Sequence, residues 1–135
     1  IYGSKGFISY QCSIPFKNSL SVIENILQII KLNKIYSFVS VLKSMGYNGK
    51  YTSFGQKGYT LVFDFPYYYN IEKTLKELDE TVHKNNGRIY LCKDSRVLQK
   101  KFMKINKEFN KKEFVDLRRS KKFFFNSIQS ERLKI

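Results

Sequence analysis

Hydrophobic and polar positions along the chain follow two kinds of pattern, one typical of strands and one typical of helices, and segments of the two kinds follow one another. Four stretches are rich in β-branched and aromatic residues and are bounded by Gly or Pro, which is typical of strands: 6–15, 35–46, 58–69 and 88–92. The stretch 58–69 gives the strongest strand pattern, and Pro66 is expected to end the sheet pairing. The stretch 35–46 is apolar on both sides near its start, as in a strand that is covered on one face and partly on the other.

Two intervening segments carry apolar residues at helical spacing. In the first, residues Asn18 to Ser21 offer N-caps and Ser21-Val22-Ile23-Glu24 fits a capping box, which predicts an amphipathic helix that runs to about Lys31. The second helix is expected to begin after Asn70 and to end before Gly87. Its apolar residues form one stripe: Ile71, Leu75, Leu78 and Val82.

The order of these elements is β-α-β, β-α-β and then a helical tail. It predicts an α+β fold of the split βαβ (ferredoxin-like) type, an antiparallel sheet with helices on one face. Residues 1–94 would form this body, and 95–135 a basic helical C-terminal extension that packs on it or on a domain outside the chain. Four apolar residues are expected to pin the extension: Phe102, Ile105, Phe109 and Phe114.

The net charge of the 135 residues is +14, which attracts phosphates of nucleic acids, membranes or substrates. AT-rich codon usage would also raise the lysine content, so charge alone identifies no partner. An RNA-recognition module would stack bases on exposed aromatic rings, but no strand carries the basic-Gly-aromatic signature of that module. Nucleic acid is therefore disfavoured as a partner, and a basic RNA-binding module is kept as an alternative.

The chain lacks the roughly 20 consecutive apolar residues of a membrane-spanning helix. We expect a cytoplasmic protein, with contact between the basic tail and an anionic membrane surface left open. The chain begins at Ile1 without a Met and reads directly into folded sequence, so we expect the C-terminal piece of a longer protein.

The sequence is poor in the residue patterns of a self-contained enzyme. Cys12 and Cys92 have no metal-ligand spacing with His83, so we expect reduced, packed thiols and no metal site. Phosphate-binding Gly loops, paired acids and nucleophile motifs are absent from the sequence. A catalytic centre would have to be shared with residues outside this chain.

Five segments in order carry a family resemblance. The first four are YQ-x-x-x-P at 10–15, VLK-x-x-G at 41–46, G-aromatic-x-x-x-x-DFP at 58–66 and R-I-Y-L-x-K-D-S-R at 88–96, and the last is F-x-S-x-x-x-x-R-L at 125–133. Together they resemble the C-terminal region of FAD-linked oxidases of the vanillyl-alcohol-oxidase type. The decaprenylphosphoryl-ribose oxidases are the most similar subgroup, and the aldonolactone oxidases are more distant. The tail departs from the family pattern, because Ile105-Asn106 stands where the family often has Tyr-Pro.

The resemblance implies an FAD cofactor, bound mainly by a missing N-terminal domain, with this chain as the substrate domain over the flavin ring. The whole protein would oxidise a secondary alcohol of a sugar, such as the 2'-hydroxyl of a polyprenylphosphoryl-ribose, by hydride transfer to flavin N5. A partner reductase would then complete an epimerisation that leads to a cell-wall arabinan precursor. The fragment alone would be inactive, and an inactive assembly subunit of the same family is a further alternative.

The resemblance also assigns roles to individual residues. Lys93 matches a family lysine whose ammonium stabilises the negative charge that hydride transfer leaves on the flavin. Tyr90 matches a tyrosine that lines the flavin and the substrate. Gln11 and Lys43 match polar groups of a sugar or phosphate pocket, and Thr60 matches another pocket position.

Overall fold

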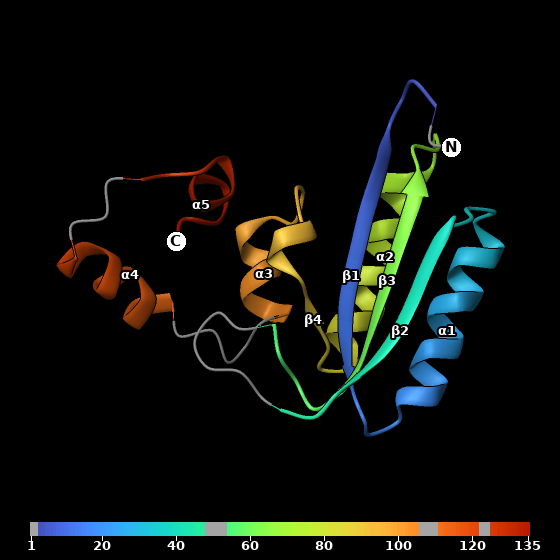
Figure 1. The fold of residues 1–135 in the computed structure, drawn as a ribbon, viewed down its shortest axis with the longest axis horizontal. Coiled ribbons are helices and arrows are strands. Elements are labelled where there is room, and N and C mark those ends of the chain that lie inside the picture. Colours follow the sequence, from blue (N-terminus) through green and yellow to red (C-terminus); the bar gives the residue numbers. More distant parts are fainter. Residues whose placement is uncertain (1–2, 48–53, 106–110, 122–124) are drawn as a thin grey trace.

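The computed structural model describes residues 3–47, 54–105, 111–121 and 125–135, and its fold is α+β (Figure 1). One antiparallel sheet has the strand order β2-β3-β1-β4, which is the order of a split βαβ fold and confirms the predicted fold class. The strands are β1 (Phe7–Pro15), β2 (Val39–Met45), β3 (Gly58–Pro66) and β4 (Arg88–Ile89). Helix α1 (Ser19–Leu32) connects β1 to β2, and helix α2 (Ile71–Lys84) connects β3 to β4.

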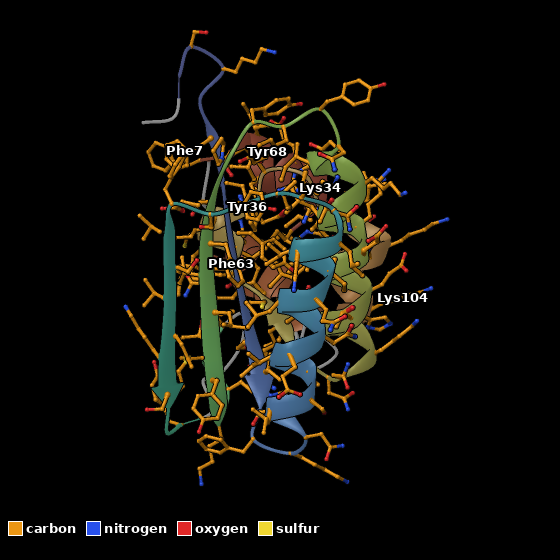
Figure 2. All side chains as sticks on the ribbon, turned by 90° about the vertical axis from the view of Figure 1, so that its right-hand side faces the viewer. Phe7, Lys34, Tyr36, Phe63, Tyr68 and Lys104 are labelled. Carbon is orange, nitrogen blue, oxygen red and sulfur yellow. The ribbon has the colours of Figure 1, made fainter. Side chains whose placement is uncertain are left out.

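Both connecting helices lie on the same face of the sheet, as Figure 2 shows. Alternate residues of β1 and β3, together with Ile89 of β4, point to that face and form the core with the helices, among them Cys12 of β1 and Phe63 of β3. The predicted stripe of α2 is confirmed, because Ile71, Leu75, Leu78 and Val82 are all fully buried. Within the described part of the chain, no helix covers the opposite face of the sheet.

The opposite, open face carries the other set of alternating residues. Gln11 of β1 pairs with Val62 of β3, and Lys43 of β2 pairs with Thr60 of β3. Because side chains of directly paired residues point to the same face, these four residues share the open face. The register of the sheet therefore gathers side chains from three separate strands on one surface.

Several predicted element boundaries were wrong. Strand β4 ends at Ile89, and the stretch predicted to continue as a strand forms the single 3-10 turn η1 (Leu91–Lys93). Helix α1 begins at Ser19, after Asn18, which is the first of the predicted N-cap positions and has a left-handed conformation. The predicted capping box at Ser21 and Glu24 is therefore absent, and the Ser21 hydroxyl instead donates to the Asn18 carbonyl at 3.0 Å. Strands β2 and β3 are shorter than the stretches 35–46 and 58–69.

The tail contains helices α3 (Gln99–Ile105), α4 (Lys111–Ser120) and α5 (Ile128–Leu133). Val97, Phe102 and Leu133 join the same core as the sheet, and Phe114 packs against it. Phe109 and the Ile105 side chain lie outside the described part of the structure, and so do residues 48–53. The division into 1–94 and 95–135 stays a prediction, although the shared core attaches the tail to the body.

None of the helices in the described ranges has the length and apolar character needed to cross a membrane.

Candidate functional site

A cavity of about 520 Å³ lies at one end of the open face of the sheet. It collects residues from β1, β2 and β3, from the segment before β3 and from the position just after β4. Its lining consists of Gln11, Lys43, Ser44, Met45, Tyr47, Phe54, Gly55, Thr60 and Tyr90. Of the five site residues predicted from the sequence, four therefore line this one cavity: Gln11, Lys43, Thr60 and Tyr90.

The floor of the cavity is set by the pairing of three strands. The Gln11 amide Nε2 donates to the Thr60 hydroxyl at 3.2 Å, and that hydroxyl donates in turn to the Cys12 carbonyl at 2.9 Å. These bonds fix the Gln11 side chain and leave its carbonyl oxygen without a partner among the described residues. The floor thus offers a fixed acceptor to a hydroxylated ligand.

Lys43 supplies the cation of the cavity. It lies opposite Thr60 in the sheet, and its side chain is exposed. Within the described ranges its ammonium makes no ion pair or hydrogen bond. An unpaired ammonium at the edge of a concave surface attracts an anionic group of a ligand.

Tyr90 forms an aromatic wall. Its backbone N–H donates to the Gln11 carbonyl at 2.9 Å, which extends the pairing of β4 with β1 by one bond and holds the ring beside the floor. The Phe54 ring lies 4.8 Å from the Tyr90 ring, centroid to centroid, at a tilt of 41°. The Cys92 thiol beside the phenol raises the pKa of Tyr90, so the phenol stays protonated and able to donate at neutral pH.

Lys93 is the one nominated residue that the structure does not place in the lining of the cavity. It ends η1, it is half-buried, and its backbone N–H donates to the Tyr90 carbonyl at 3.1 Å. The turn therefore joins Lys93 to the cavity wall through Tyr90. A group on which the Lys93 ammonium acts would lie beside the cavity rather than inside it.

Three polar residues that the sequence reasoning missed hold the segment before β3 over the end of the sheet. Arg88 Nη1 donates to the Gly55 carbonyl at 2.6 Å, and Gln56 Nε2 donates to the Asn86 carbonyl at 3.0 Å. The Ser13 hydroxyl donates to Gln56 Oε1 at 3.3 Å. The available signal was Arg88 itself, a charged residue at the start of an otherwise apolar strand.

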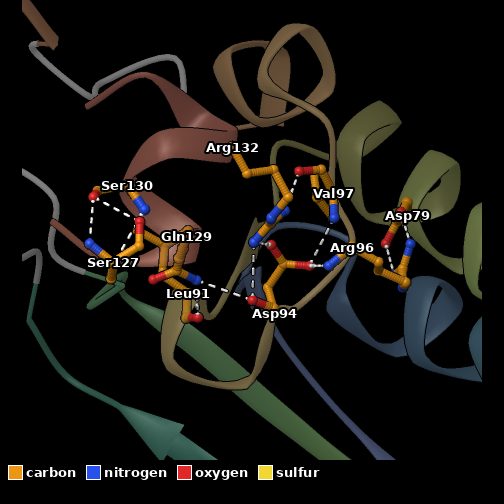
Figure 3. Close-up of polar contacts among 9 residues, drawn as sticks. All are labelled: Asp79, Leu91, Asp94, Arg96, Val97, Ser127, Gln129, Ser130 and Arg132. Atoms are coloured by element: carbon orange, nitrogen blue, oxygen red, sulfur yellow. Dashed lines mark hydrogen bonds and ion pairs between the residues drawn. The ribbon is translucent and has the colours of Figure 1, made fainter.

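Asp94 and Arg96, the charged pair that follows Lys93, act structurally in this fold (Figure 3). The Arg96 guanidinium binds both carboxylate oxygens of Asp79 in α2, at 2.8 and 2.9 Å. Burial lowers the pKa of Arg96, but the hydrogen bonds and charge of Asp79, together with smaller effects of Tyr10 and Asp94, leave the pKa raised, so the guanidinium stays charged. Asp94 Oδ1 accepts from the backbone N–H of Arg96 and of Val97, while Oδ2 pairs with Arg132.

The two cysteines differ in their environment. Cys12 is buried, and burial raises the pKa of its thiol to about 12. The prediction that Cys92 is a packed thiol was wrong, since the chain turns at η1 and leaves Cys92 exposed. Within the described ranges, no group of three or more His, Cys, Asp and Glu side chains could hold a metal ion. His83 lies half-buried on α2.

Comparison with known proteins places this geometry in context. The chain is 32% identical over 120 residues to the decaprenylphosphoryl-beta-D-ribose oxidase of Mycolicibacterium smegmatis. The match covers 88% of this chain, and the chain spans about a quarter of the length of that relative (25%). No protein-family model matches the chain. The resemblance that the five sequence motifs indicated is thus confirmed, and the chain is related to an oxidase.

Proposed function

We propose that the chain is the substrate-binding part of an FAD-dependent oxidoreductase that oxidises a secondary alcohol of a sugar. The first candidate is the 2'-hydroxyl of a polyprenylphosphoryl-ribose. One observation carries the proposal: Gln11, Lys43, Thr60 and Tyr90 come from four separate family-like motifs and line a single cavity. The relationship to an oxidase supports the same reaction class.

The residues on the open face fit a flavin bound by a neighbouring domain. The face is free of covering helices in the described part of the chain, so a second domain can approach it. Tyr90 and Phe54 present aromatic surface there, and Lys93 is a cation one turn away. FAD would supply the hydride acceptor. The Lys93 ammonium would stabilise the negative charge that develops on the flavin, which lowers the barrier to hydride transfer.

The cavity itself suits a sugar that bears an anionic group. Gln11 offers a fixed carbonyl acceptor, and the protonated Tyr90 phenol offers a donor to sugar hydroxyls. Lys43 would bind a phosphate oxygen, because its ammonium has no competing carboxylate among the described residues. The polar floor and aromatic wall resemble the usual composition of small-molecule sites.

The proposal extends to partners. A lipid-linked sugar would bring the protein to a membrane surface, where exposed basic residues of the tail such as Lys112, Arg119 and Lys121 favour anionic lipids. A ketone product would pass to a reductase that completes the epimerisation.

The test is anaerobic mixing of the flavin-loaded protein that contains this chain with polyprenylphosphoryl-ribose, followed by absorbance of the oxidised flavin. Lys93→Met should slow flavin reduction by orders of magnitude while FAD stays bound, because uncompensated charge raises the barrier. Lys31→Met, on the exposed side of α1, is the matched control and should react at the wild-type rate.

An unchanged rate in Lys93→Met removes Lys93 from the mechanism. Bound FAD that the substrate never reduces, even in the wild-type protein, would indicate an inactive assembly subunit. Flavin that co-purifies with these 135 residues alone would contradict the proposal that a separate domain binds FAD while this chain binds the substrate.

A further inference from the structure

The turn that carries the proposed site residues has little support of its own. Within η1 and its flanks, two backbone bonds close the turn: Lys93 N–H to the Tyr90 carbonyl and Asp94 N–H to the Leu91 carbonyl, both at 3.1 Å. A single 3-10 turn has poorer hydrogen-bond geometry than an α-helix and is seldom stable alone. Its conformation must therefore be set by contacts from elsewhere in the fold.

Gln129 of α5 provides two of these contacts. Its Nε2 donates to the Leu91 carbonyl at 2.5 Å and to the Asp94 carbonyl at 2.9 Å (Figure 3). Leu91 begins η1 and Asp94 follows its last residue, so the Gln129 amide group is hydrogen-bonded to the turn at both of its ends. The opening of either end would break a bond to α5.

Arg132, one helical turn further along α5, holds the segment that follows. Its Nη2 donates to the Asp94 carbonyl at 3.1 Å and to Asp94 Oδ2 at 3.0 Å, and its Nη1 donates to the Val97 carbonyl. Asp94 Oδ1 meanwhile accepts from the Val97 N–H at 3.0 Å. The segment between Asp94 and Val97 is thus bound to α5 through both backbone and side chain.

Helix α5 is itself fixed in place, so its side chains can hold the turn in a defined position. Leu133 is fully buried in the core. Ser127 and Ser130 form a reciprocal capping box, with bonds of 3.0 Å and 2.9 Å between each hydroxyl and the other residue's N–H. A helix with a capped start and a buried end presents Gln129 and Arg132 to the turn from a defined position.

We propose that Gln129 and Arg132 are positioning residues, which hold the 90–94 turn so that Tyr90 and Lys93 keep their places at the site. The catalytic meaning of this inference rests on the proposed function. Neither residue lines the cavity, so each acts on substrate only through the turn.

We call the hydrogen bonds of Gln129 and Arg132 to Leu91, Asp94 and Val97 the clamp. Amide hydrogen exchange of the flavin-loaded protein tests the clamp without reference to activity. Gln129→Met removes both donors at nearly constant side-chain length, and it should speed exchange at the Lys93 and Asp94 amides by roughly tenfold, as expected for two lost hydrogen bonds. Exchange in α2 should stay as in the wild-type protein. Ile26→Val, a change at a fully buried position of α1, is the control for a general loss of stability. Arg132→Gln is the second clamp variant.

A catalytic readout separates this inference from the proposed function. With polyprenylphosphoryl-ribose, Gln129→Met should lower kcat by roughly tenfold with KM nearly unchanged, because the floor of the cavity stays intact. Faster turn exchange in a protein that shows no flavin reduction would uphold the clamp and reject the function. Exchange in Gln129→Met and Arg132→Gln that is unchanged, or raised equally across the protein as in Ile26→Val, would overturn the clamp itself.

Discussion

The carboxylate of Asp94 lies 3.0 Å from the guanidinium of Arg132, with 2% and 17% of the two side chains exposed. Asp94 belongs to the K-D-S-R segment and Arg132 to the closing R-L segment, 38 residues later in the chain. Two motifs that looked independent in the sequence are therefore one structural unit, and that unit supports the turn beside the cavity.

The first prediction concerns this pair. Arg132→Met should lower the free energy of unfolding by about 3 kcal/mol, because it leaves the nearly buried Asp94 carboxylate without its cationic partner. The Asp94→Asn single change should cost less, since the amide carries no charge to desolvate. Urea unfolding measures both values.

A double-mutant cycle checks the cause of that loss. Asp94→Asn combined with Arg132→Met should cost less than the sum of the two single changes by about 1–2 kcal/mol. Additive losses would mean that the two side chains act independently. Arg119→Met, on the exposed side of α4, is the matched control and should change stability by less than about 0.5 kcal/mol.

The second prediction concerns Lys43 and depends on the proposed function. Lys43→Gln should raise KM for polyprenylphosphoryl-ribose roughly tenfold, because a charge-assisted hydrogen bond to phosphate is lost. The same change should leave KM for a ribose analogue without phosphate nearly unaltered. Steady-state kinetics with both compounds, and with Lys31→Gln as control, makes the comparison. Equal effects on the two compounds would mean that Lys43 does not bind the anionic group.

The sequence predicted those parts of the fold that depend on local patterns. The stripe of α2 follows from spacing alone, because helical periodicity places Ile71, Leu75, Leu78 and Val82 on one face whatever surrounds them. The split βαβ fold class followed from the order of elements, since right-handed crossovers leave few arrangements of two βαβ units. The meeting of Gln11, Lys43, Thr60 and Tyr90 followed from the family resemblance, and the strand register supplies its physical basis.

The parts that could not be predicted depend on contacts between residues far apart in the sequence. Strand β4 stops at Ile89, and the turn η1 follows in place of its predicted continuation. Gln129, 38 residues after Leu91, donates hydrogen bonds to the Leu91 and Asp94 carbonyls of this turn. The predicted capping box at Ser21 was wrong for a local reason, because Asn18, with φ 59°, is the N-cap and the helix begins at Ser19. Apolar periodicity carries no information on either event.

The third prediction tests the close pairing of β1 with β3 at Gly58. A Cβ on Gly58 would lie 1.9 Å from the Ile14 carbonyl oxygen, which is backbone and cannot rotate away. Gly58→Ala should therefore force the strands apart and cost about 3 kcal/mol or more of unfolding free energy. Gly46→Ala is the control, since a Cβ there meets nothing within 4 Å, and it should be neutral or slightly stabilising. Similar stabilities for the two variants would show that β1 and β3 pair differently near Gly58.

The last prediction concerns pH and the buried thiol of Cys12. Burial, with a smaller effect of the Asp79 charge, raises its pKa from the ordinary value of 9.0 to about 12. Above pH 9 the thiol of the unfolded chain loses its proton while the folded thiol keeps it, so rising pH favours the unfolded state. The stability due to the protonated thiol is complete below pH 9 and is lost progressively between pH 9 and 12.

Cys12→Ala isolates this effect. At pH 7 the variant should be less stable than the wild-type protein, because it leaves a small cavity among fully buried neighbours such as Ile14. At about pH 10 the difference in unfolding free energy should be smaller by about 1.4 kcal/mol, since only the wild-type protein loses thiol stabilisation. Urea unfolding of both proteins across this range gives the comparison, with Tyr10→Phe introduced into both because the Cys12 charge also raises the pKa of Tyr10. A constant difference from pH 7 to pH 10 would show that water reaches the Cys12 thiol in the folded protein.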